Sequence, residues 1–240
     1  MSKKLDTEKN ILVVSAHADD HITSAGSVFK LQSQGYNAYE ILLTNSQEGR
    51  DRRGKSKSAK NAVINLRVGE FDRATEFLGV KQKFLLAEED LNLQFSKKLM
   101  FKVVKIIRQV KPEVIFTLNP LDYHSDHREA AHIVEEASFW AATGVKPELG
   151  EPHRTPTVLY GEGMLPIVAQ IIVDITDFID KKMELFSIYE SQADSKSTVF
   201  ERSLNCVRGY HLRRSTKNEY AEGFTVNPKF PNIIFDYKDD

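Results

Sequence analysis

Two short clusters of histidine and aspartate contain the residue types that could do chemistry. The first is HADDH at residues 17–21, and the second is HSDH at residues 124–127. Charged side chains cost several kcal/mol to bury unless they are paired or bind a metal. His17 and Asp20 are three residues apart, so a single turn can bring both to one ion. One imidazole from the second cluster would complete a set of two histidines and one carboxylate.

This ligand set suits two kinds of metal site, and His124 or His127 can supply the second imidazole. Catalytic zinc sites use three protein ligands of this kind and leave a position for water. The same set suits non-haem iron oxygenases. Asp19 is a carboxylate beside the ion that is not needed as a ligand, and hydrolysis needs such a base. Taken alone, each cluster could also be a helix N-cap. In the second cluster, for example, Asp126 could cap the helix that starts near His127.

Strands and helices alternate along the chain, and this alternation decides where the clusters lie. Short apolar runs predict strands at 11–16, 38–44, 83–86, 113–118, 157–160 and 171–175. Amphipathic stretches predict helices at 21–35, 62–78, 95–110, the second half of 121–142, and 177–192. The pattern predicts an α/β fold, with a mostly parallel sheet flanked by helices on both faces. In a sheet of order 3-2-1-4, the first and fourth strands are neighbours, so the two clusters would meet at their carboxyl ends.

Composition limits the class of protein. The 240 residues are 41% hydrophobic and 28% charged, which predicts one folded domain over residues 1–240 with a polar tail at 1–10. A net charge of −1 gives no reason to expect nucleic acid as a partner. We expect a cytoplasmic protein without a stable membrane anchor, because neither a signal peptide nor an apolar run of ~18 residues is visible. The single cysteine, Cys206, excludes an internal disulfide.

Together the clusters resemble the LmbE-like/PIG-L family of zinc-dependent deacetylases, which remove acetyl from N-acetylglucosaminyl groups or related amino sugars. In that family the first motif usually reads AHPDDE and the second HxDH. TNSQEGR at 44–50 resembles the family's T-x-G-E-x-G loop, and residues 66–70 and 78–80 resemble its helix with Arg-x-x-Glu. Its C-terminal blocks resemble residues 182, 189–192 and 220–224. The resemblance covers nearly the whole chain and implies a Rossmann-like fold.

The resemblance implies a metal centre and a base. His17, Asp20 and His127 would hold Zn²⁺, with another divalent ion such as Fe²⁺ as the alternative. Asp19 would be the general base that activates zinc-bound water.

The resemblance also implies roles for residues around the metal. His124 would stabilise the oxyanion of the tetrahedral intermediate or protonate the leaving amine, and Asp126 would orient an imidazole. Arg67 and Glu48 would contact the substrate. The alternative for Arg67 is an ordinary ion pair with Glu70 on the same helix.

The sequence departs from the family pattern at three places. Ala18 replaces the usual proline, which removes up to ~1 kcal/mol of loop preorganisation. His21 replaces the usual glutamate and puts a titratable imidazole beside the site, unless its role is structural. Ser46 and Gln47 stand where a glycine is common. The basic loop at 50–57 could attract an anionic substrate group, although a solvated loop is the preferred interpretation.

The leading hypothesis is a zinc hydrolase that deacetylates a small amino-sugar conjugate of the N-acetylglucosamine type. Segment 144–156 and the C-terminal region would form the walls of its pocket. One alternative is a hydrolase of another small-molecule amide, and the other is a non-catalytic metal- or sugar-binding relative. Retention of Asp19 argues against the second alternative, because metal binding alone does not need it. The resemblance also allows a homo-oligomer.

Overall fold

One mixed sheet organises the computed structural model, which describes residues 8–49, 60–212 and 219–227. Within these ranges the strands follow the order β3-β2-β1-β4-β5-β7-β6, so the predicted order 3-2-1-4 is confirmed. Neighbours among the first five strands of this order are parallel, whereas β7 runs antiparallel to both β5 and β6. The strands are β1 (Asn10–Ser15), β2 (Asn37–Thr44), β3 (Val80–Glu88), β4 (Val114–Leu118), β5 (Thr157–Gly161), β6 (Ile171–Asp174) and β7 (Ala221–Val226).

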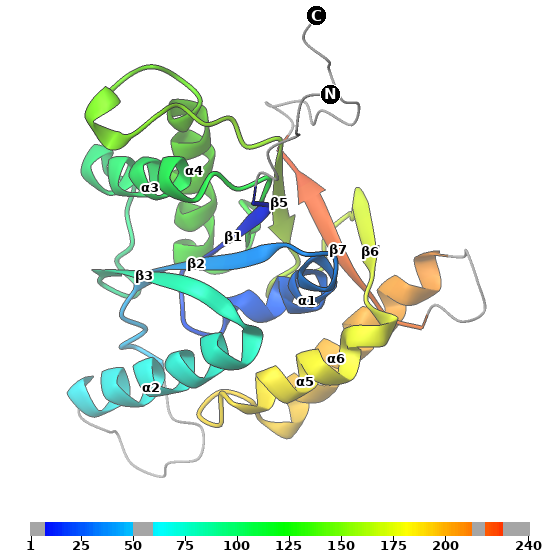
Figure 1. Cartoon of the computed structure of the whole chain (residues 1–240). Coiled ribbons are helices and arrows are strands. Elements are labelled where there is room, and N and C mark those ends of the chain that lie inside the picture. The colour runs from blue at the N-terminus through cyan, green and yellow to red at the C-terminus, as the bar shows by residue number, and fades with distance from the viewer. Residues whose placement is uncertain (1–7, 50–59, 213–218, 228–240) are drawn as a thin grey trace, which may run out of the picture.

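Helices cover both faces of the sheet, as predicted. In Figure 1, α3 and α4 lie on one face, and α1, α2, α5 and α6 lie on the other. The helices are α1 (Ala25–Ser33), α2 (Lys60–Leu78), α3 (Lys97–Val110), α4 (Ser125–Ala141), α5 (Ile179–Ser187) and α6 (Ser195–Leu212). Short 3-10 turns form at Asp20–Ser24, Pro147–Leu149 and Thr176–Phe178.

Two apolar cores follow from the alternation of side chains along the strands. Leu12 and Val14 of β1 pack into the core with α3 and α4. Ile11 and Val13 pack into the opposite core, with α1, α2 and α5. Successive side chains of a strand point to opposite faces, so a strand buried on both sides is apolar throughout. This is why β1 could be recognised from its sequence.

The structure differs from the prediction at three places. The helix expected at 21–35 starts as a 3-10 turn, in which Thr23 Oγ1 donates to the Asp20 carbonyl at 2.9 Å, and α1 begins only at Ala25. Such side-chain bonds to the local backbone compete with regular helix. The helix expected at 177–192 ends at Ser187. The prediction also missed α6 and β7.

Asn10, expected in the polar tail, is the buried first residue of β1, and residues 1–7 lie outside the described ranges. Among the helices of the described ranges, none has the length and apolar character that crossing a bilayer requires. The single-domain assignment stays a prediction.

Candidate active site

A pocket of about 380 Å³ opens at the carboxyl ends of the parallel strands. It brings together seven of the eight residues that the sequence analysis selected. Asp126, the eighth, is fully buried. The described residues that line the pocket are His17, Asp19, Asp20, Glu48, Gly49, Arg67, Asp90, Leu91, His124, His127, Met164 and Gln192.

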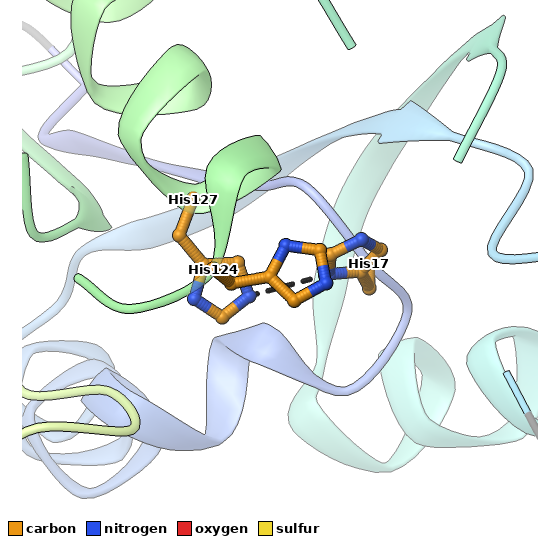
Figure 2. A group of neighbouring side chains, drawn as sticks. All are labelled: His17, His124 and His127. Atoms are coloured by element: carbon orange, nitrogen blue, oxygen red, sulfur yellow. Dashed lines mark hydrogen bonds between the residues drawn. The ribbon is translucent and has the colours of Figure 1, made fainter. Parts of the chain in front are cut away.

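Neighbouring strands place the two clusters together. β1 pairs with β4, and His17 follows the end of β1 by two residues. After β4 the chain turns and enters α4, where His124 is the N-cap residue and His127 lies in the first turn. Figure 2 shows the three imidazole rings gathered at this point, with His17 arriving from the opposite side of the group. The ring centroids of His17 and His124 are 4.6 Å apart, and those of His124 and His127 are 4.8 Å apart.

The side chains of His17, Asp20 and His127 converge on one point. His17 Nδ1 lies 3.2 Å from His127 Nε2, and Asp20 Oδ1 lies 3.2 Å from the same His127 nitrogen (Figure 2 draws the first contact). Asp20 Oδ2 lies 3.5 Å from His17 Nδ1. Ligands at 2.0–2.1 Å from a tetrahedral ion are about 3.3 Å apart. The donor atoms therefore fit a divalent cation of zinc size. His17, His124 and His127 also form a group that could hold a metal ion.

The charges of this cluster favour a cation between the rings. Burial alone would lower the pKa of His127, but Asp20 and Asp122 raise it to about 9. Burial is likewise outweighed at His17, where Asp20 and its other carboxylate neighbours raise the pKa well above its usual value. Burial would raise the pKa of Asp20, yet His127 and His17 hold it well below its usual value. A carboxylate that stays ionised beside two imidazoles is the environment that a metal cation prefers.

Further carboxylates contact the outer nitrogens of the two imidazoles. His17 Nε2 lies 3.1 Å from Asp90 Oδ1 and 3.3 Å from Asp126 Oδ2. His127 Nδ1 lies 3.2 Å from Asp122 Oδ1, although the contact is not aligned as a hydrogen bond. Carboxylates in such places orient metal-ligating histidines. The sequence analysis had not selected Asp90 or Asp122.

Asp19 stands beside this cluster with a partner of its own. Arg67 Nη2 donates to Asp19 Oδ1 at 2.6 Å, and Arg67 Nη1 is 4.0 Å from Glu70 Oε2. The contact with Glu70 is the ion pair that was considered for Arg67, whereas the contact with Asp19 was not expected; the Arg67 side chain is 4% exposed. The Asp19 side chain is 25% exposed and faces the pocket, so solvent can reach it.

His124 has a defined proton arrangement. Its Nδ1 accepts a hydrogen bond from the backbone N–H of Asp126 at 3.2 Å. Burial, together with His17 and His127, lowers the pKa of His124, so its imidazole is neutral near pH 7. A neutral ring that accepts at Nδ1 carries its proton on Nε2. His124 therefore offers the pocket one hydrogen-bond donor.

The surroundings of the pocket agree with the expectations only in part. Of the two roles considered for His21, its position fits the structural one, because it is buried between Glu40 and Tyr189 and does not line the pocket. Segment 144–156 does not line it either, since Arg108 of α3 donates to the carbonyls of Trp140, Ala141, Thr143, Val145, Lys146 and Gly150 and holds this region against that helix. Met164, from the segment after β5, takes its place. The basic loop at 50–57 lies outside the described residues.

Known proteins are similar to this chain over most of its length. The chain is 28% identical to the 4-oxalmesaconate hydratase of Pseudomonas putida, over 94% of this chain and 91% of that protein. It is 27% identical to the diacetylchitobiose deacetylase of Thermococcus kodakarensis, over 92% of this chain and 84% of the relative. The crystal structure of the 4-carboxy-2-hydroxymuconate hydratase of Pseudomonas putida matches with a TM-score of 0.83 and 25% identity, covering 94% and 98% of the two chains.

A family profile also matches the chain. The PIG-L profile, described as GlcNAc-PI de-N-acetylase, matches residues 12–138. That match is more than half of the chain and contains both histidine–aspartate clusters. The chain belongs to the PIG-L family of GlcNAc-PI de-N-acetylases.

Proposed function

We propose that this protein is a metal-dependent N-deacetylase that removes acetyl from a small amino-sugar conjugate of the N-acetylglucosamine type. The observation that carries the proposal is Asp19. This carboxylate is solvent-accessible on the pocket wall, and it stands next to His17, Asp20 and His127, the proposed metal donors, without being one of them. A binding protein would need the donors alone, whereas hydrolysis also needs a base.

Each side chain has a role that follows from its contacts. His17, Asp20 and His127 would hold the cation, which when bound would act as a Lewis acid toward the amide carbonyl and water. Arg67 holds Oδ1 of Asp19, and the second carboxylate oxygen then accepts a proton from the attacking water. His124 donates from Nε2 to the carbonyl oxygen as negative charge develops there. Asp19 then gives that proton to the leaving nitrogen as the carbon–nitrogen bond breaks, so the products are acetate and a free amine and Asp19 is again a carboxylate.

A substrate amino sugar would be bound by groups of the remaining pocket wall. Arg67 lines this wall and would offer its guanidinium to a polar substrate group. Its Nε and Nη1 have no hydrogen-bond partner among the described residues, but both atoms lie below the surface of the pocket. Glu48 lines the same wall, and its backbone N–H donates to Asp90 at 2.9 Å. Cationic and anionic side chains on one wall suit a ligand with several hydroxyl groups.

The second candidate function is hydration of an unsaturated carboxylate. It is favoured by the 28% identity to a hydratase over nearly the whole chain. The guanidinium of Arg67 on the pocket wall would suit a carboxylate as well as a hydroxyl group. Water activated by Asp19 would serve either reaction, so activity has to separate the two.

The test is acetate release from a panel of N-acetylglucosamine conjugates by the zinc-loaded protein and its Asp19→Asn variant. We expect the variant to lose about 10²- to 10⁴-fold in kcat while its zinc content stays the same. Asp72→Asn is the matched control, because Asp72 is an exposed carboxylate that pairs with Lys83. Full activity of Asp19→Asn would contradict the proposal. Consumption of 4-oxalmesaconate without any acetate release would assign the hydratase function instead.

A further inference from the structure

The peptide backbone at Ala18 is held from two sides by side chains that the proposed mechanism does not use. Ala18 lies between His17 and Asp19 and is 1% exposed. Its N–H donates to Ser46 Oγ at 3.0 Å, and its carbonyl accepts a hydrogen bond from the Tyr189 hydroxyl. We propose that Ser46 and Tyr189 are positioning residues, which clamp the Ala18 peptide and thereby fix the direction of the Asp19 carboxylate.

Ser46 has a backbone conformation that favours glycine. Its φ is +52°, in the left-handed region, which is uncommon for a residue with a Cβ. Its side chain is nevertheless buried, and its own N–H donates to Thr44 Oγ1 at 3.1 Å. A serine in a place where glycine is less strained needs a compensating interaction. The hydrogen bond from Ala18 is that interaction.

The clamp joins two departures from the family pattern that are far apart in the sequence. Proline, the usual residue at position 18, has no N–H, so it would need no acceptor there. Ala18 introduces a buried N–H, and a buried donor without a partner is costly. Ser46, in the loop where glycine is common, introduces the hydroxyl that accepts from it. The chain thus replaces a rigid ring with a hydrogen bond between two loops.

The carbonyl side of the clamp reaches deep into the protein. Tyr189 is fully buried, and its hydroxyl also lies 3.0 Å from His21 Nε2. His21 Nδ1 lies 3.0 Å from both carboxylate oxygens of Glu40 on β2. Ser15 Oγ donates to the same carboxylate at 2.9 Å. Every residue in this hydrogen-bonded series has a partner, so the Tyr189 hydroxyl is held in one place.

Rotation of the Ala18 peptide would turn Asp19 away from its present position. Both groups that resist this rotation come from outside the loop: Ser46 follows β2, and Tyr189 follows α5. Loss of either hydrogen bond should therefore lower kcat more than it raises KM. The catalytic half of the inference rests on the proposed function, but the hydrogen bonds themselves do not.

The first test is amide hydrogen exchange at Ala18, followed by NMR in the full-length protein. Ser46→Ala keeps the left-handed backbone strain and removes the acceptor, so exchange at Ala18 should become about tenfold faster. Ala87→Gly is the matched control for backbone effects, because Ala87 has φ +56° and an exposed side chain. Unchanged exchange in Ser46→Ala would overturn the clamp, whatever reaction the protein catalyses.

The second test is rescue by the residue that needs no acceptor. Ser46→Gly should lower kcat for acetate release about tenfold with little change in KM, even though glycine suits the backbone better. Ala18→Pro removes the orphaned donor, so the double variant Ala18→Pro/Ser46→Gly should recover most of that loss. Additive effects of the two substitutions would overturn the pairing of Ser46 with Ala18.

A third comparison separates positioning from folding. Tyr189→Phe removes only the hydroxyl, and we expect kcat to fall about tenfold while the urea midpoint and zinc content shift far less. Equal losses in kcat and in the urea midpoint would assign Tyr189 a purely structural role and contradict the inference. If the unmodified protein released no acetate, the exchange test would still decide the clamp, and only the proposed function would fail.

Discussion

Both ring nitrogens of His127 face carboxylates, and these two contacts have different consequences. Asp20 lies at Nε2 on the metal side, and Asp122 lies at Nδ1 on the far side. Asp122 also accepts backbone hydrogen bonds from His124 at 2.9 Å and from Met164 at 3.1 Å. A Cβ on Gly163 would collide with its carboxylate, so the chain passes close at this point. Asp122 therefore connects His127, a proposed metal donor, with the start of α4 and the pocket wall.

Replacing this carboxylate by an amide should weaken metal binding without unfolding the protein. In Asp122→Asn the side chain keeps one oxygen, which can accept one of the two backbone hydrogen bonds, but it loses the other bond and the charge beside His127. We expect zinc affinity to fall about 10- to 100-fold, as measured by competition with a fluorescent chelator. Asp180→Asn, on an exposed carboxylate paired with Arg202, should leave affinity unchanged. Unaltered affinity in Asp122→Asn would show that His127 needs no such support.

The sequence predicts the inner residues of the site better than its outer ones. His17 and Asp20 could be selected because their spacing along one turn is itself a ligand pattern. Asp90 could not, because it ends the acidic run AEED at 87–90, which is typical of a surface loop. Its contact with His17 spans 73 positions, and only the fold creates it.

At the scale of elements, the last described strand supports the first helix. Glu222 of β7 accepts hydrogen bonds from the backbone N–H groups of Gly26 at 2.9 Å and Ser27 at 2.8 Å. These are orphan donors at the start of α1, the helix that follows the metal-site loop. The fully buried Lys182 Nζ lies 2.7 Å from Glu222 and 2.7 Å from Glu201. Charge on Glu222 thus neutralises a buried lysine and caps a helix at once.

Removing that charge should cost stability. Glu222→Gln would leave Lys182 with Glu201 as its remaining carboxylate partner. The amide NH₂ of the glutamine would also face a group that is itself a donor, either Lys182 Nζ or a backbone N–H of α1. We expect the free energy of unfolding to fall by roughly 2–3 kcal/mol, less than for a fully broken buried pair. Urea unfolding measures it, with Glu184→Gln on the exposed face of α5 as the control. Equal stability of the two variants would contradict a capping role for Glu222.

The same elements show where prediction from pattern stops. β1 and β4 are predictable because each is a short apolar run buried on both faces. The pattern could not reveal α6, since Val199, Phe200 and Tyr210 are exposed and blur its amphipathic period. β7 contains Gly223 and a buried Glu222, both unfavourable by strand propensity. Its place in the sheet depends on tertiary partners that no local window contains.

At the scale of the whole molecule, net charge and local charge diverge. The chain carries a formal charge of −1, yet Asp20, Asp90 and Asp122 gather around the imidazoles of one pocket. In the metal-free protein these carboxylates attract protons. Asp20 and Asp122 raise the pKa of His127 to about 9 despite burial, whereas an unfolded histidine titrates near 6.5. The folded protein therefore binds this proton more tightly than the unfolded chain does.

This difference predicts how the stability of the metal-free protein depends on pH. The contribution of His127 is fully present below pH 6.5 and is lost as the pH rises through about 9. We expect the free energy of unfolding of the protein freed of metal by a chelator to fall by on the order of 3 kcal/mol across this pH range. Bound Zn²⁺ should remove most of the decline, because the cation replaces the proton. Urea curves at several pH values test this, with the exposed His132→Gln variant as the control. A free energy of unfolding that does not change with pH in the metal-free protein would contradict this prediction.

The position of β7 between β5 and β6 has a consequence for synthesis on the ribosome. β6 contacts the sheet through β7 alone among the described strands, yet β7 is made roughly fifty residues later. At bacterial or eukaryotic elongation rates this is a delay of about 3 to 10 s. During that time β5 presents an open edge to other nascent chains, and β6 has no partner. A chaperone that shields this edge would therefore act on the emerging chain within a defined interval, which closes when β7 inserts.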